Sequence, residues 1–85
     1  MKKYIYFYFM KREPEKTRQI VPQHVEYWHG LNIDGYLGGP FSDRSGGLIT
    51  FTAENLDQAM NIVKKDPFIR EDLLADRWIK EWLVE

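Results

Sequence analysis

His24 and His29 are the two histidines of the chain, and histidine is the side chain best suited to exchange protons near neutral pH. Both lie in the segment 15–31, whose apolar residues recur at the spacing of an amphipathic helix. The predicted buried stripe consists of Ile20, His24, Tyr27, Trp28 and Leu31. This spacing turns His24 inward and His29 toward the opposite, solvated face. His24 is therefore either a core histidine bound to a backbone carbonyl or a general acid–base group facing a pocket.

Asp66 is followed by Pro67 and Phe68, a combination that often begins a helix. An aspartate at the N-cap accepts hydrogen bonds from the first backbone N–H groups, and proline fits the first helical position. We therefore predict a short helical segment from Pro67 to about Leu74. Capping alone explains this aspartate, but a carboxylate fixed in this way could also orient a neighbouring imidazole.

Gly38, Gly39 and Pro40 follow the predicted strand start Tyr36-Leu37 and carry no bulky side chains. A ligand could approach the backbone there, although a plain turn explains the same residues equally well. The pattern is not a phosphate loop, since neither Lys-Ser nor Lys-Thr follows it. Aromatic residues are more often core than ligand-binding, yet some must line any cavity. The residues that we expect to line a substrate pocket are Gly39, Pro40, Phe41, Tyr6 and Phe68.

The composition argues against several other kinds of site. The absence of cysteine excludes disulfides, thiolate nucleophiles and thiolate metal sites. Two histidines on opposite helix faces cannot share one metal ion, so we expect no metal and no cofactor. Twelve basic and thirteen acidic residues are scattered along the chain, without the basic stripe that binding to nucleic acid would need.

The segment 4–10 is entirely aromatic or aliphatic and predicts a central strand. The run is too short to span a membrane, and no small-residue cleavage site follows Lys2-Lys3 and the apolar run, so we expect a cytoplasmic protein without a membrane partner. Alternation divides the strand into two faces. We expect one face to pack against helices and the other to carry phenol groups; they consist of Ile5, Phe7 and Phe9, and of Tyr4, Tyr6 and Tyr8.

The rest of the chain supplies three more strands and a second helix. Strands are predicted over residues 36–41, 48–52 and 77–84. Asn55, with Gln58 three residues later, predicts the start of the second helix. The order strand, helix, strand, strand, helix, strand predicts an α+β fold, a ferredoxin-like βαββαβ sandwich with a four-stranded antiparallel sheet, as one domain over residues 1–85.

In this fold both helices cover one face of the sheet. The other face would carry Tyr4, Tyr6, Tyr8, Trp78 and Trp82. An exposed aromatic patch of that size marks an interaction surface, so we predict a homodimer through the helix-free sheet face.

Four short motifs occur together over essentially the whole chain: Pro22-Gln23-His24, Gly35-Tyr36-Leu37-Gly38-Gly39-Pro40, Gly46-Gly47-Leu48 and Asp66-Pro67-Phe68. In order and spacing the sequence resembles the YciI-like (YCII-related) family. The resemblance implies a dimeric α/β-barrel and an active site built around a His-Asp pair, here His24 and Asp66. One branch of that family acts as a dehydrochlorinase on a chlorinated, hydroxylated aromatic compound.

Val21 stands where many relatives carry an arginine. If that arginine holds an anionic substrate, either Arg18 or Arg44 replaces it here, or the function is missing.

Two hypotheses for function remain. In the first, the protein is a cofactor-free enzyme that performs elimination or isomerisation on a small organic molecule, with aromatic compounds among the candidates, and His24 is the acid–base group that Asp66 orients. In the second, a non-catalytic dimer binds or senses a small ligand.

Overall fold

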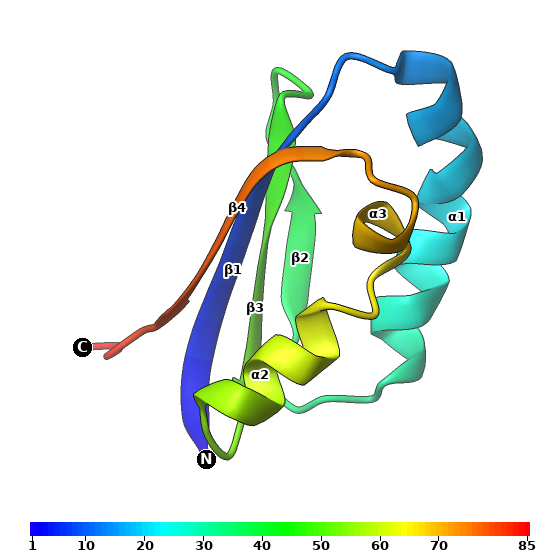
Figure 1. Cartoon of the computed structure of the whole chain (residues 1–85). Helices are drawn as coiled ribbons and strands as arrows, with labels where there is room; N and C mark the ends of the chain where they lie inside the picture. The colour runs from blue at the N-terminus through cyan, green and yellow to red at the C-terminus, as the bar shows by residue number, and fades with distance from the viewer.

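Four antiparallel strands form one sheet, and all the helices lie on one side of it (Figure 1). The structure is a computed structural model that describes residues 1–85. Its elements are β1 (Lys2–Met10), α1 (Pro14–Gly30), β2 (Leu37–Pro40), β3 (Gly46–Ala53), α2 (Leu56–Val63), α3 (Pro67–Arg70) and β4 (Leu74–Glu81). The spatial strand order is β2-β3-β1-β4. The predicted ferredoxin-like α+β fold is confirmed.

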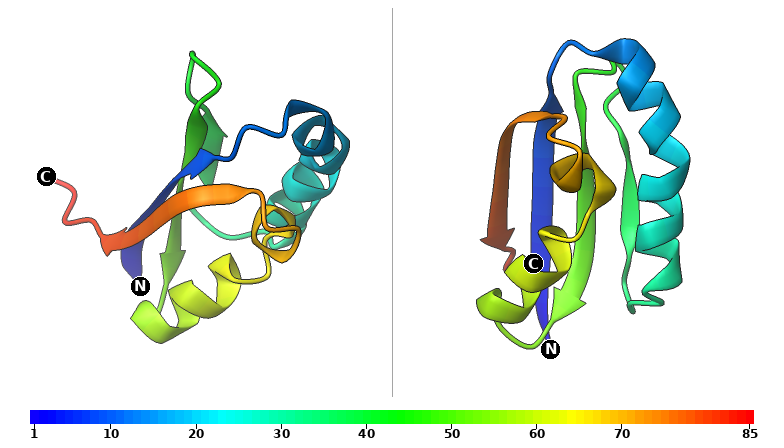
Figure 2. Two further views of the ribbon diagram at one scale, coloured as in Figure 1. Left: turned by 45° about the horizontal axis from the view of Figure 1, so that its top comes forward. Right: turned by 45° about the vertical axis from the view of Figure 1, so that its right-hand side comes forward.

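The helices form one layer, with α1 running alongside β2 and α3 lying beside α1 over the same face of the sheet (Figures 1 and 2). The helix predicted over residues 15–31 is observed as α1, which continues through Pro22 as one helix. At the start of α2, Asn55 Oδ1 accepts a hydrogen bond from the Gln58 backbone N–H, as the spacing predicts. The Gln58 side chain returns to the backbone N–H of Glu54, which closes the turn before the helix.

The boundary between α3 and β4 differs from the prediction. Helix α3 ends at Arg70, four residues before the predicted end, and β4 begins at Leu74 instead of Arg77. Asp72 adopts the left-handed region with φ 55°, and the Leu73 N–H bonds back to the Phe68 carbonyl. Aspartate tolerates that conformation, which ends the helix and allows the chain to enter the sheet early.

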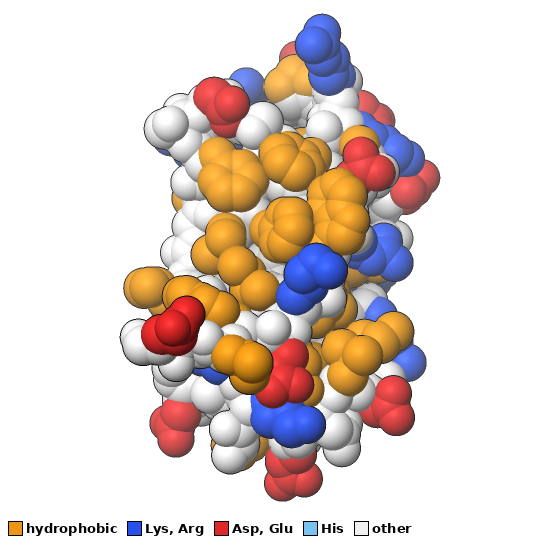
Figure 3. All heavy atoms as spheres, turned by 90° about the vertical axis from the view of Figure 1, so that its left-hand side faces the viewer, with side chains coloured by type: hydrophobic (Ala, Val, Ile, Leu, Met, Phe, Trp, Pro, Cys, Tyr) orange, Lys and Arg blue, Asp and Glu red, His pale blue; other side chains and the backbone are white.

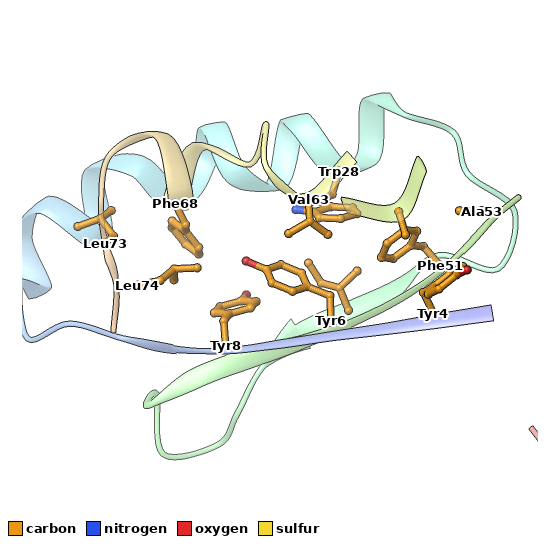
Figure 4. Packing of buried hydrophobic residues seen from close by; sticks show 12 residues of the cluster. Tyr4, Tyr6, Tyr8, Trp28, Phe51, Ala53, Val63, Phe68, Leu73 and Leu74 are labelled. Carbon is orange, nitrogen blue, oxygen red and sulfur yellow. The ribbon is translucent and has the colours of Figure 1, made fainter. Parts of the chain in front are cut away.

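The tyrosines of β1 lie on the face opposite to the one predicted. Tyr4, Tyr6 and Tyr8 are buried and point toward the helices, where Trp28 and Phe68 pack above them (Figure 4). The prediction that these phenols face away from the helices is therefore wrong. Alternation correctly grouped the residues of each face, but it cannot tell which face the helices cover, because both groups are apolar enough to be buried.

The helix-free face carries the other half of β1 together with side chains from β3 and β4. Cross-strand pairing places Phe7 beside Leu48 on one neighbour and Trp78 on the other. The Phe7 and Trp78 rings stack with centroids 5.2 Å apart, and Trp78 is 41% exposed. Figure 3 shows this face with hydrophobic side chains gathered over the sheet. Trp78 is thus on the predicted face, although the tyrosines are not.

No helix of this fold has both the length and the apolar character needed to cross a bilayer.

Candidate active site

His24 and Asp66 are joined by a hydrogen bond between His24 Nδ1 and Asp66 Oδ1, 2.8 Å long. The two residues come from different elements, since His24 lies in α1 and Asp66 is the N-cap of α3. The same Oδ1 accepts the backbone N–H of Phe68 at 2.8 Å, which is the predicted cap. Capping therefore fixes the carboxylate that receives the histidine, and the expected contact between the two residues is confirmed.

Trp28 completes the set of donors around this carboxylate. Its indole Nε1–H donates to Asp66 Oδ2 at 2.8 Å. Trp28 follows His24 by four residues, so α1 presents both ring N–H groups to the same carboxylate, one to each oxygen. Asp66 is completely buried, and three hydrogen bonds compensate for the loss of water around its charge. The sequence analysis placed Trp28 only in the core, although its spacing from His24 was a signal for this role.

The hydrogen bond to Asp66 determines which nitrogen of a neutral His24 ring carries the proton. An ionised carboxylate only accepts hydrogen bonds, so Nδ1 must be the donor. Nε2 is then left with a free lone pair, on the far side of the ring from Asp66. The ring is held flat against Phe68, with centroids 4.0 Å apart and an interplanar angle of 11°. Histidine orientation and tautomer are therefore both set by α3.

Tyr8 approaches that free nitrogen, with its Oη 3.5 Å from His24 Nε2. Burial and, to a smaller extent, the Asp66 charge raise the pKa of Tyr8 far above its ordinary value. The phenol therefore remains protonated and acts as a donor over the whole physiological range. The same two causes, in the same order, raise the pKa of Tyr6, whose buried hydroxyl has no hydrogen-bond partner.

A cavity of about 220 Å³ lies beside His24 and Tyr8 and is lined by residues of α1 and β2. The backbone of β2 forms one wall, and Val21 and Val25 of α1 form the opposite one. Most of its lining is apolar or aromatic, with a few polar groups, which is usual for a small-molecule site. It is close in size to an apolar cavity of about 150 Å³ that binds benzene in another protein.

The YCII-related domain family matches residues 1–83. The chain is also 31% identical over 84 residues to the uncharacterised protein YjpA of Bacillus subtilis (strain 168), an alignment that covers 96% of this chain and 98% of YjpA. The chain belongs to the YCII-related family. The resemblance inferred from the four motifs is thus confirmed.

Two solved structures support the fold of this YCII-related protein. One is the 5-chloro-2-hydroxyhydroquinone dehydrochlorinase of Burkholderia phenoliruptrix AC1100 in complex with 2,5-dihydroxybenzoquinone, with a TM-score of 0.82 and 20% identity, covering 98% of this chain and 95% of that one. The other is an antibiotic biosynthesis monooxygenase, with a TM-score of 0.71 and 14% identity, covering 100% of this chain and 99% of that one. At these identities the similarity establishes the fold.

Three of the five residues expected to line a pocket in the YCII-related protein do so: Gly39, Pro40 and Phe68. The other two do not. Tyr6 is fully buried beneath Trp28, because its face of β1 is the core face. Phe41 lies beyond the end of β2 and packs against Phe9, with ring centroids 5.8 Å apart.

The cavity also includes residues that the sequence analysis did not assign to it. Arg44 lines it from the turn between β2 and β3, and it also lines a second groove together with Arg18, which does not line the cavity. His29, predicted to be remote from His24, lies on the cavity rim and meets Tyr36 edge-on at 5.6 Å. These residues meet because β2 lies next to α1 in the fold. The spacing of apolar residues along α1 does not predict which strand lies next to it.

Proposed function

We propose that this YCII-related protein is a cofactor-free enzyme that performs acid–base elimination or isomerisation on a small, ring-sized, oxygen-bearing molecule. The observation that carries the proposal is the arrangement of His24, whose Nδ1 is bound at 2.8 Å to a buried carboxylate while Nε2 lies beside a cavity with only a long, 3.5 Å contact to Tyr8 Oη. A histidine that served only the scaffold would have both nitrogens in short hydrogen bonds to the protein. The rival role, a non-catalytic ligand-binding dimer, does not require this polarised arrangement.

In the proposed reaction, His24 Nε2 removes a proton from a carbon of the substrate, and the ring becomes an imidazolium. Asp66 holds the orientation of the ring and stabilises the new positive charge across the 2.8 Å hydrogen bond. In an elimination, the C–H electron pair becomes the new double bond, the leaving group departs with its bonding pair, and His24 releases the proton to solvent. In an isomerisation, His24 returns the proton to a different carbon, so neither reaction changes the oxidation state overall.

The ligand chemistry follows from the size of the cavity and from the structural neighbour. A volume of about 220 Å³ accommodates one substituted ring. The neighbour of known activity was solved with 2,5-dihydroxybenzoquinone, a single ring that carries acidic enol groups. Arg44 makes no salt bridge within the chain and lies at the cavity, which suits an anionic oxygen on the ligand.

The wild-type protein is expected to bind 2,5-dihydroxybenzoquinone and to accelerate exchange of its ring hydrogens with D₂O, measured by calorimetry and proton NMR. Arg44→Gln should weaken binding about two- to five-fold, as expected for an exposed ion pair. Arg18→Gln makes the same charge change at a residue that does not line the cavity, and this variant should bind like wild type. Binding without any exchange would favour the non-catalytic role, and equal losses in both variants would remove Arg44 from the site.

We also propose that the functional unit is a homodimer formed through the helix-free face. This face has a contiguous aromatic surface around Phe7, Phe9 and Trp78, and no helix of the chain covers it (Figure 3). A second copy related by a two-fold axis would present the same surface, so each copy would cover the aromatic patch of the other. In a monomer this apolar surface would remain exposed to water, which is energetically unfavourable and marks an interaction surface.

Trp78→Lys is expected to weaken dimerisation by about 30-fold or more, because central aromatic residues dominate such interfaces. Sedimentation at micromolar concentrations measures the change. Leu56→Glu is the matched control, since Leu56 is also half-exposed and apolar but lies on α2, on the opposite side of the sheet. A wild-type protein that sediments as a monomer would overturn the proposed dimer.

A further inference from the structure

Tyr8 and His24 present two different hydrogen-bonding groups to the same cavity. Tyr8 Oη lies 3.5 Å from His24 Nε2, which is longer than a well-formed hydrogen bond of about 2.7 to 3.2 Å. Both residues line the cavity, so one ligand can contact the hydroxyl and the imidazole together. The rings meet edge to face at 70°, with centroids 6.0 Å apart. The two groups are thus adjacent but only weakly engaged with each other.

The two groups also differ in what they do with a proton. The Asp66 hydrogen bond leaves His24 Nε2 as an acceptor when the ring is neutral. Burial first, then the charges of Asp66 and Tyr36, raise the pKa of Tyr8, which therefore keeps its proton. The cavity consequently contains a base and, beside it, a donor that does not compete for the role of base.

The position of the Tyr8 hydroxyl is fixed by the opposing strand. Tyr8 pairs with Gly47 of β3, and a Cβ at Gly47 would lie 2.5 Å from Tyr8 Oη and 2.9 Å from Cζ. Glycine at this position therefore leaves room for the end of the phenol. Phe68 closes the other side, with its ring centroid 5.9 Å from that of Tyr8. A donor held this firmly needs little reorganisation during a reaction.

We propose that Tyr8 is a second catalytic residue, whose O–H donates a hydrogen bond to the substrate oxygen that gains negative charge when His24 removes a proton from the adjacent carbon. This inference rests on the proposed function and narrows its substrate class. A base and a donor side by side suit a molecule whose acidic C–H is on the carbon next to a carbonyl group, such as an enolisable ketone or the keto tautomer of a hydroxyquinone.

The step balances without any added reagent. His24 Nε2 forms a bond to the proton, the C–H electron pair becomes a carbon–carbon double bond, and the carbonyl π electrons move onto oxygen. Tyr8 donates to that oxygen while keeping its own proton. When the electrons return, either a leaving group is expelled from the neighbouring carbon or a proton is added at a different carbon.

Tyr6 provides a matched control on the same strand. Its hydroxyl is also buried, yet it has no hydrogen-bond partner and does not line the cavity. Tyr6→Phe and Tyr8→Phe remove the same oxygen and retain the same ring. Because the packing of both rings is preserved, both variants are expected to fold, as checked by circular dichroism. They differ in whether the lost hydroxyl reaches the cavity.

The experiment measures exchange of the ring hydrogens of 2,5-dihydroxybenzoquinone with D₂O at saturating and limiting concentrations. Tyr8→Phe should lower the saturated exchange rate by about 10²-fold, the typical effect of losing one oxyanion donor, with a smaller change in the dissociation constant. Tyr6→Phe should retain the wild-type rate.

Two results would overturn the assignment, and they are distinguishable. If wild type exchanges faster than His24→Asn but Tyr8→Phe matches Tyr6→Phe, then Tyr8 has no catalytic role and the proposed function stands. If wild type exchanges no faster than His24→Asn, the proposed function fails and the role of Tyr8 fails with it. A loss confined to the dissociation constant would reduce Tyr8 to a binding residue.

Discussion

Asp66→Asn is expected to lower proton transfer by about 10²- to 10⁴-fold, because the variant removes the only negative charge in contact with His24. An imidazole that takes up a proton becomes positive, and the neutral amide cannot stabilise that charge. The effect does not depend on the way in which the amide is oriented. The measurement is the rate at which the ring hydrogens of 2,5-dihydroxybenzoquinone exchange with D₂O when the protein is saturated with this compound.

The same variant is expected to lose about 1 to 3 kcal/mol of unfolding free energy. Asp66 accepts from three donors, of which Trp28 uses one oxygen and Phe68 and His24 share the other. The asparagine amide has only one oxygen that can accept. In one orientation its NH₂ group faces the Trp28 Nε1–H, and in the other it faces the Phe68 N–H, so a donor meets a donor in both cases. Either way, at least one buried donor loses its acceptor.

Asp76→Asn is the control for this prediction, because it makes the same chemical change at an exposed position of β4. It should alter neither the exchange rate nor the midpoint of denaturant unfolding. If Asp66→Asn loses stability but exchanges at the wild-type rate, the carboxylate is only a cap and the catalytic pair is wrong. Unchanged stability would instead contradict the three hydrogen bonds.

Local patterns were sufficient to predict the parts of the site that depend on one element. The cap at Asp66 follows from Asp-Pro-Phe, and the inward direction of His24 follows from the stripe of α1. Their contact was expected only from the family resemblance, because residue patterns do not give the distance between two side chains that are 42 positions apart in the sequence. The helix order and the sheet were predictable because hydrophobic periodicity changes between 3.6 and 2 along the chain.

Features that depend on how elements pack were not predictable in the same way. The two faces of β1 are similarly apolar, so the burial of Tyr8 rather than Phe7 is decided by which face meets α1 and α3. Tyr6 and Tyr8 share this face, but Tyr6 lies against Trp28 whereas Tyr8 lies beside His24 and lines the cavity. Gly47 offered a signal that went unused, since a glycine inside a strand often marks a close approach by another group.

His24→Asn is expected to lower proton transfer by about 10²-fold or more while leaving most of the stability intact. The amide nitrogen of asparagine occupies nearly the position of Nδ1, so it can still donate to Asp66. No group replaces Nε2, which removes the base. The lost stacking on Phe68 should cost about 0.5 to 1.5 kcal/mol in unfolding free energy, the usual worth of an aromatic pair.

His24→Gln tests the other ring nitrogen. Its longer side chain brings an amide near the position of Nε2 but no longer donates to Asp66 Oδ1, so the unfolding free energy should fall further than in His24→Asn. His29→Ala, at the exposed rim, should change stability by less than about 0.5 kcal/mol. Denaturant unfolding at a fixed protein concentration compares the three variants. Two results together would contradict a catalytic role: His24→Asn unfolds more easily than His24→Gln, and wild type shows no exchange. His24 would then be a structural core residue, because the lost stability would come from packing and not from the nitrogen that faces the cavity.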